Sequence, residues 1–202
     1  TLTPQLDANE DDSTLVLVDL GRGQHRMAGS ILAQTLGQSG DTVPDLDDPA
    51  QLVALVNAVN ALRADGKILA MHDRSDGGLF AAACEMAFAG HVGVALNVDM
   101  LVTEGDGISD SRMETGDAKN WAQQVSARRE ELTLKALFNE ELGMLLQVRT
   151  AERNEVMQVL RAHGLSTHSH FIGKTRPASS AIEAGKGLSL IHISEPTRLR
   201  RI

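Results

Sequence analysis

The sequence predicts an α/β fold of the layered α+β type, in which helices pack on a mixed sheet. Short apolar runs rich in β-branched residues alternate along the 202 residues with longer segments whose apolar side chains recur at helical spacing. Two helical segments separate the first two predicted strands, so a strictly doubly wound sheet is not expected. The hydrophobic fraction of 42% is enough to build the core of one domain.

The first predicted elements are a strand and two helices. Residues 14–20, TLVLVDL, are a short apolar run and predict a buried strand. Residues 27–38 place apolar side chains along one helical face, which predicts a helix. Asp48 and Pro49 are typical of an N-cap and a first helical position, and the apolar stripe after them ends at Gly66.

The middle of the chain continues the alternation of strands and helices. Residues 67–71, KILAM, predict a buried strand, and residues 79–89, LFAAACEMAFA, predict a helix. The alternating pattern of residues 92–98 predicts another strand. Residues 104–129 are polar and predict a surface insertion, after which residues 131–138 predict a short helix.

The last predicted elements are a strand at 144–149, an amphipathic helix at 151–163 and a strand at 169–174. Residues 188–202, LSLIHISEPTRLRRI, differ abruptly in character and carry three arginines against one glutamate. They resemble a translated sequencing-adapter tail, so we expect the native domain to span 1–187. A native basic tail is the alternative.

Composition narrows the classes of function. A formal net charge of −8 and an aromatic content of 2% disfavour nucleic acid as a partner, since binding it needs basic patches and stacking platforms. No apolar run approaches the ~20 residues of a membrane span. The single cysteine, Cys84, excludes a disulfide framework and fits a cytoplasmic protein. It lies inside a predicted helix, where a core residue is expected rather than a nucleophile.

Residues 72–78, HDRSDGG, are the segment best suited to chemistry, because they join a predicted strand to a predicted helix. The N–H groups at the start of a helix point back at such a turn and favour anions. Asp73 supplies the hard oxygen that Mg²⁺ prefers, and the Ser75 hydroxyl can reach a phosphate oxygen. These parts suit a Mg-nucleotide, with Asp73 on the metal and Ser75 on the nucleotide. The weaker candidates for the same site are His72, Asp76, Gly77, Gly78 and Glu140.

The same turn also fits a purely structural role, in which Asp76 or Ser75 caps the helix that follows. A second acidic segment, FNEELG at 138–143, carries Glu140 and Glu141. These carboxylates could support a metal or position a substrate, and the alternative is a solvated turn.

Other motifs give weaker signals. VDLGRG at 18–23 is a glycine-rich strand exit that could cradle phosphate, but it lacks the Lys-Ser/Thr of a P-loop. His168 and His170 alternate on a predicted strand and so face one side, but two histidines without a third ligand are weak support for zinc. His25 and His91 are expected at the surface.

Five motifs give the chain a family resemblance: TPQL at 3–6, LVDLGRG at 17–23, HDRSDGGL at 72–79, EMAFAGHVG at 85–93 and LFNEELG at 137–143. Over roughly residues 1–185 they resemble the last synthetase C-terminal domain of the large single-chain phosphoribosylformylglycinamidine synthase family of purine biosynthesis. The domain type is shared with aminoimidazole ribonucleotide synthetase and other members of that ATP-binding superfamily.

The resemblance implies an ATP- and glutamine-dependent C–N ligase. In this family ATP phosphorylates the amide oxygen of formylglycinamide ribonucleotide, and ammonia from a separate glutaminase domain displaces the phosphate. The family's motif aspartate binds Mg²⁺ and its motif serine contacts ATP or ADP, roles that fall on Asp73 and Ser75. The family has one catalytic and one structural nucleotide site, and this motif is expected to serve the structural one. The expected partners are the nucleotide and the missing N-terminal synthetase and C-terminal glutaminase domains, so this chain alone is expected to be inactive.

Two other functions remain open. The chain could belong to another ATP-dependent enzyme of the superfamily, such as a kinase-like or selenophosphate-forming member, which would not continue into a glutaminase. It could instead be a non-catalytic interaction domain, in which case Asp73 would lie buried against its own helix.

Overall fold

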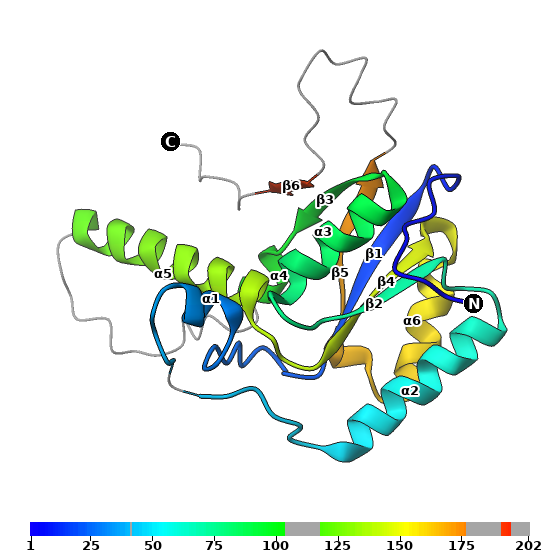
Figure 1. Cartoon of the computed structure of the whole chain (residues 1–202), viewed down its shortest axis with the longest axis horizontal. Helices are drawn as coiled ribbons and strands as arrows, with labels where there is room; N and C mark the ends of the chain where they lie inside the picture. The colour runs from blue at the N-terminus through cyan, green and yellow to red at the C-terminus, as the bar shows by residue number, and fades with distance from the viewer. Residues whose placement is uncertain (41, 104–117, 177–190, 195–202) are drawn as a thin grey trace, which may run out of the picture.

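The computed structural model describes residues 1–40, 42–103, 118–176 and 191–194 (Figure 1). The strands are β1 (Ser13–Asp19), β2 (Ala70–Asp73), β3 (Gly93–Asn97), β4 (Gly143–Arg149), β5 (Ser169–Arg176) and β6 (Ile191–Ser194). The α-helices are α1 (Ile31–Thr35), α2 (Pro49–Ala64), α3 (Gly78–Gly90), α4 (Asp99–Thr103), α5 (Ala118–Phe138) and α6 (Arg153–Ala162). Two 3-10 turns are η1 (Thr150–Glu152) and η2 (Ser166–His168).

The described strands form one mixed sheet in the order β2-β4-β1-β5-β3-β6. Neighbouring strands are antiparallel except β3 and β6, which are parallel. β1 lies inside the sheet and is buried along its whole length, which explains why its sequence is apolar without alternation. The predicted layered fold, a mixed sheet with packed helices, is confirmed.

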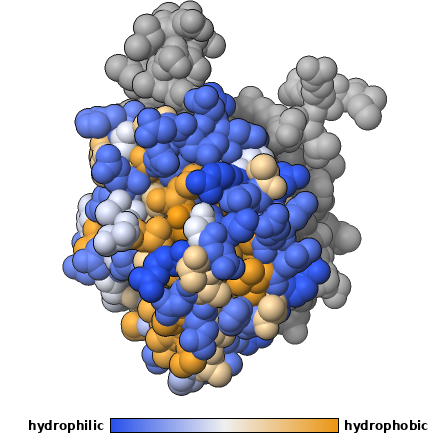
Figure 2. All heavy atoms as spheres, turned by 90° about the vertical axis from the view of Figure 1, so that its right-hand side faces the viewer, coloured by the Kyte–Doolittle hydropathy of each residue, from blue (hydrophilic) through white to orange (hydrophobic). Residues whose placement is uncertain are grey.

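Helices cover both faces of the sheet (Figure 1). Alternate residues of β1 point into different cores, because side chains alternate across a strand. Leu15 and Leu17 pack with buried residues of α3, α4 and α5, whereas Val16 and Val18 pack with those of α2 and α6. Figure 2 shows the side on which α2 and α6 lie, where apolar patches are divided by hydrophilic residues.

The first residues of the chain lie along the free edge of β2 and the end of α3. The Met71 N–H donates to the Thr3 carbonyl (N···O 3.0 Å), and the Leu6 N–H donates to the Met86 carbonyl (3.4 Å). Leu6 is buried, and a Cβ built on Gly90 would lie 2.5 Å from the Leu6 carbonyl oxygen. Since β2 pairs with β4 on one side, this segment covers an edge strand.

One predicted helix is too long. α1 has five residues instead of spanning 27–38. Gly29 has a φ of +77°, which is not helical, so the helix begins only after it. Ser30 caps the helix by accepting a hydrogen bond from the Ala33 N–H (3.2 Å). The apolar side chains before Gly29 therefore belong to a loop.

Two other predicted boundaries also differ. α5 begins at Ala118, so part of the polar segment 104–129 is helical, while residues 104–117 lie outside the described residues. β2 ends at Asp73 instead of Met71, because its pairing with β4 continues until Asp73 lies opposite Met144. That residues 188–202 are a non-native tail stays a prediction.

Candidate functional site

Three of the motif loops meet at one end of the sheet. β1 ends at Asp19 opposite Gly143, where β4 begins, and β2 ends at Asp73 opposite Met144. The loops carrying VDLGRG, HDRSDGG and FNEELG are therefore neighbours in space although they are far apart in the sequence.

Arg74, in the middle of HDRSDGG, holds these loops together. Its side chain is 1% exposed. Its Nη2 donates to Asp19 Oδ1 (2.5 Å) and to the Leu142 carbonyl (3.2 Å), and its Nε donates to the Glu141 carbonyl (2.6 Å). Its backbone N–H donates to the Gly143 carbonyl (2.9 Å). The turn that follows β2 is thus fixed to β1 and to the start of β4.

The Asp19 carboxylate organises the loop after β1. It accepts hydrogen bonds from the N–H groups of Gly21 (3.1 Å) and Gly23 (3.0 Å) as well as from Arg74. Burial raises the pKa of this carboxyl, but the charge of Arg74 and the hydrogen bonds from Arg74 and Gly23 outweigh burial and lower the pKa overall. Asp19 is therefore ionised at neutral pH, and Arg74 balances its charge.

Three polar residues of the HDRSDGG motif, Asp73, Ser75 and Asp76, are accessible. The Asp73 side chain is 72% exposed, and Ser75 and Asp76 are exposed. His72 Nε2 lies 2.7 Å from Glu85 Oε2 on α3, and its Nδ1 lies 3.3 Å from Asp73 Oδ1. A ligand can therefore reach Asp73 and Ser75 from solvent. The non-catalytic alternative expects Asp73 to be buried against its own helix, and the structure does not show this.

The start of α3 is bound by a residue of another loop. Its N-cap, Gly77, has a φ of +80° and no side-chain capping bond from its own segment. The Gly77 N–H donates to Glu140 Oε1 (2.8 Å), which also accepts from the Ile31 N–H (2.8 Å). Capping by Asp76 or Ser75, the structural role that the sequence suggested, is therefore wrong. Glu140 joins the starts of α1 and α3.

Gly78 stands where the chain tolerates no side chain. Its φ is +70°, and an added Cβ would lie 2.6 Å from the Asn139 carbonyl oxygen and 2.8 Å from that of Leu137. The glycine pair of the motif thus permits a left-handed turn and a close approach to the FNEELG loop.

Glu141 is buried and forms an ion pair with Arg26. Its carboxylate accepts from Arg26 Nε and Nη2, each at 2.7 Å, and from the Arg26 backbone N–H (2.9 Å). These hydrogen bonds raise the pKa of Arg26. Glu141 therefore does not lie in a solvated turn.

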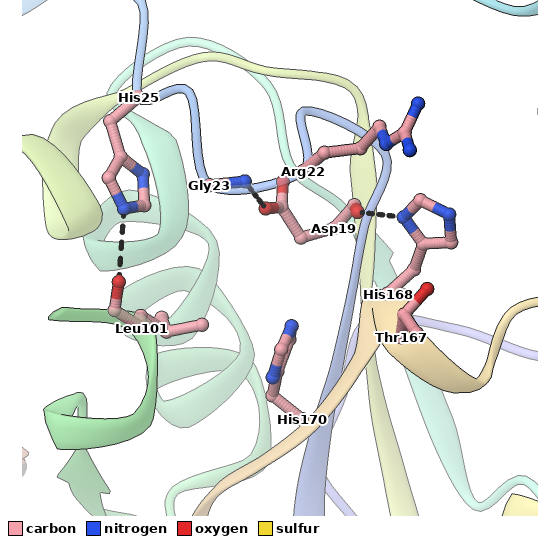
Figure 3. A pocket seen from close by; sticks show the side chains of 8 residues that line it. All are labelled: Asp19, Arg22, Gly23, His25, Leu101, Thr167, His168 and His170. Atoms are coloured by element: carbon pink, nitrogen blue, oxygen red, sulfur yellow. Dashed lines mark hydrogen bonds between the residues drawn. The ribbon is translucent and has the colours of Figure 1, made fainter. Parts of the chain in front are cut away.

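A cavity of about 300 Å³ lies between the loop after β1, α4 and the start of β5 (Figure 3). Its polar lining residues are Asp19, Arg22, His25, Thr167, His168 and His170. His168 belongs to η2 and not to a strand, yet it shares this cavity with His170, so the two histidines do come together.

His25 is buried, contrary to the expectation that it lies at the surface, while His91 is exposed as expected. The His25 Nε2 is hydrogen-bonded to the Leu101 carbonyl (3.1 Å), so Nε2 donates. Its Nδ1 accepts from Asn139 Nδ2 (3.2 Å). Burial lowers the pKa of His25, and the imidazole is therefore neutral at pH 7.

In the described part of the chain, no three His, Cys, Asp or Glu side chains form a metal-binding group. A magnesium ion at Asp73 would need further oxygen ligands from a nucleotide, which agrees with its habit of binding one or two carboxylates and several phosphate oxygens. Burial raises the pKa of Cys84, so this thiol is not an activated nucleophile. Among the described residues, no helix has the length and apolarity to cross a membrane.

The residues that hold the site together were missed by sequence analysis: Arg74, Asp19 and Arg26. Each is a charged residue whose ion-pair partner comes from a segment remote in the sequence. The sequence signal that could have suggested these contacts is the presence of VDLGRG, HDRSDGG and FNEELG together in one chain.

The chain combines a helix-covered mixed sheet with three motif loops that meet at one end of it. The family described as AIR synthase related protein, C-terminal domain, matches residues 10–183, and the chain belongs to this family.

Particular structures share the fold. Phosphoribosylformylglycinamidine synthase II from Thermotoga maritima superposes with a TM-score of 0.54 at 14% identity, over 87% of this chain and 23% of that chain. T. maritima PurL complexed with ATP gives the same values. HypE from E. coli superposes with a TM-score of 0.52 at 19% identity, over 95% of this chain and 49% of that chain. This chain therefore spans about a quarter of the synthase chains and about half of the HypE chain.

Proposed function

We propose that this chain is the C-terminal synthetase domain of an ATP- and glutamine-dependent ligase that converts formylglycinamide ribonucleotide to formylglycinamidine ribonucleotide. Its role in that cytoplasmic enzyme is to contribute to a Mg-nucleotide site. The observation that carries the proposal is the HDRSDGG loop, which presents Asp73 and Ser75 to solvent from a turn that the buried Arg74 holds in place. The similarly folded T. maritima PurL forms a complex with ATP, which supports the nucleotide.

In this proposal Asp73 binds Mg²⁺, and Ser75 donates a hydrogen bond to a phosphate oxygen. Bound magnesium supplies positive charge that offsets the charge of the nucleotide phosphates. The contribution of this chain is to hold the HDRSDGG turn in place. Arg74 holds the turn through Asp19, and Glu140 holds the start of α3, so the backbone that carries Asp73 and Ser75 is in place before a ligand binds.

The proposed enzyme includes parts that lie outside this chain. A glutaminase domain would supply the nucleophilic cysteine with its histidine and glutamate partners, and an N-terminal synthetase domain would supply further metal carboxylates. We therefore expect the 202-residue chain to form no amidine by itself.

A second candidate is an ATP-using enzyme of the same superfamily without a glutaminase. The specific observation in its favour is the E. coli HypE fold, which covers 95% of this chain. The uninterrupted coding sequence separates the two candidates, because the synthase continues into a glutaminase with Cys, His and Glu.

The test is isothermal titration calorimetry of Mg-ADP binding to the full synthetase. Asp73→Asn is expected to weaken binding about tenfold to a hundredfold, since a lost charge-assisted contact costs about 1.5–3 kcal/mol. Asp11→Asn is the matched control, because Asp11 is an exposed aspartate just before the start of β1, at the other end of that strand from the motif loops. An unchanged affinity in Asp73→Asn would show that Asp73 does not bind the metal, and equal wild-type binding in EDTA would exclude magnesium.

A further inference from the structure

The cavity between the loop after β1, α4 and β5 is lined by none of the HDRSDGG residues, so the proposed nucleotide site does not account for it. We propose that this cavity binds the phosphate group of a small phosphorylated molecule. The proposal rests on the cavity's own residues and does not depend on the function proposed above.

The charge in the cavity is positive. The one carboxylate in its lining, Asp19, is balanced by Arg74 and by two backbone N–H groups. Arg22 is exposed and forms no ion pair with any described residue. The nearby Asp47 is already bound by Arg26 (3.0 Å) and Gln24 (2.7 Å). The Arg22 guanidinium is therefore available to an anion, with the forked geometry that suits phosphate.

His168 adds a second group of the right kind. Its Nδ1 donates to the Asp19 backbone carbonyl (3.0 Å), and because a carbonyl can only accept, the proton sits on Nδ1. The opposite ring nitrogen, Nε2, has no partner among the described residues, although His168 is only 5% exposed. This Nε2 can accept a hydrogen bond from a hydroxyl of a bound molecule.

The backbone around the cavity is held in an uncommon shape. Arg22 and His25 have φ values of +56° and +50°, and Gly23 lies between them with +72°. Left-handed conformations cost energy for residues other than glycine, and they persist where surrounding contacts impose them. Here Asp19 holds the Gly23 N–H, and the Leu101 carbonyl and Asn139 hold the His25 ring. These contacts hold the loop in its left-handed conformation without a ligand.

The shape of the cavity favours a molecule over a free ion. Figure 3 shows side chains from three parts of the chain around it, with the His170 ring rising from β5 and His25 entering from the loop after β1. Thr167 adds a hydroxyl to the lining. A volume of about 300 Å³ matches the lower end of small-molecule sites, roughly 300–1,000 Å³. We therefore assign the site to a phosphate ester with a small organic group.

The test uses the 202-residue chain without magnesium or nucleotide, so that its outcome is independent of the Mg-nucleotide site. Glycerol 3-phosphate, inorganic phosphate and glycerol are titrated while the ring C–H resonances of His168 and His170 are followed by NMR. We expect saturable shifts with glycerol 3-phosphate and none with glycerol. Arg22→Gln should weaken binding about tenfold, because one charge-assisted hydrogen bond is lost.

Arg63→Gln is the matched control, since Arg63 is an exposed arginine on α2 without an ion pair among the described residues. It should bind like the wild type. The assignment is overturned if the shifts do not saturate, or if both arginine variants weaken binding equally. Binding of inorganic phosphate with exclusion of glycerol 3-phosphate would also overturn it.

Discussion

Arg74 is the single side chain whose loss we expect to destabilise the domain most. Arg74→Met keeps a long side chain but leaves the Asp19 carboxylate, with 4% of its side chain exposed, without a counter-charge. Removing one partner of a buried ion pair costs about 3–5 kcal/mol. The carbonyls of Glu141 and Leu142 lose their donor as well, so we expect the upper half of that range.

The loss can be measured by urea unfolding followed by circular dichroism, and by thermal unfolding. A loss of about 4–5 kcal/mol corresponds to a fall in Tm of roughly 8–20 °C, because 1 kcal/mol shifts Tm by about 2–4 °C in domains of this size. Arg63→Met, at an exposed arginine, should stay within about 0.5 kcal/mol of the wild type. Arg74→Met combined with Asp19→Asn should recover part of the loss, since no unpaired charge remains. A loss below about 1 kcal/mol in Arg74→Met would refute the reasoning.

Two further predictions concern Gly78 and His25. Gly78→Ala should lower the free energy of unfolding by more than Gly66→Ala. Both glycines have a positive φ, but a Cβ added at Gly78 meets the Asn139 carbonyl, whereas one added at Gly66 meets open space. Equal losses of stability in urea would contradict the close approach at Gly78. The folded pKa of His25 lies below its ordinary value of 6.5, so its stabilising contribution is complete above pH 6.5 and is lost as the pH falls through the folded pKa. Wild type should therefore lose more stability between pH 7 and pH 5 than His25→Asn, and parallel urea midpoints at the two pH values would argue against a buried neutral imidazole.

Elements whose local pattern matches their surroundings could be predicted from the sequence. β1 is buried on both faces, and its uninterrupted apolar run indicates this. α2 carries its own signals, and the Asp48 side chain does accept from the Ala50 N–H (2.9 Å). α5 could not be predicted in full, because the sequence of its first part is polar. Among its described side chains, Ala136 and Leu137 lie in the core.

The location of the candidate site could be predicted from the sequence, but the contacts that hold its loop could not. A strand-to-helix turn with Asp73 and Ser75 is visible in the sequence, and the structure leaves both exposed. Asp76 looked like the cap of α3 because capping preferences are local. Glu140 replaces it from a loop that is remote in the sequence, and no local pattern reports such a contact.

The segment TPQL limits how far the domain can be shortened. A protein trimmed to start at β1 would leave the Met71 amide without the Thr3 carbonyl and would empty the space that Leu6 fills beside Gly90. The unpaired amide would lie in β2, the strand that ends in Asp73. The first residues of the chain therefore support the strand that carries Asp73, and we expect that trimming them weakens nucleotide binding at the proposed site although Asp73 and Ser75 remain.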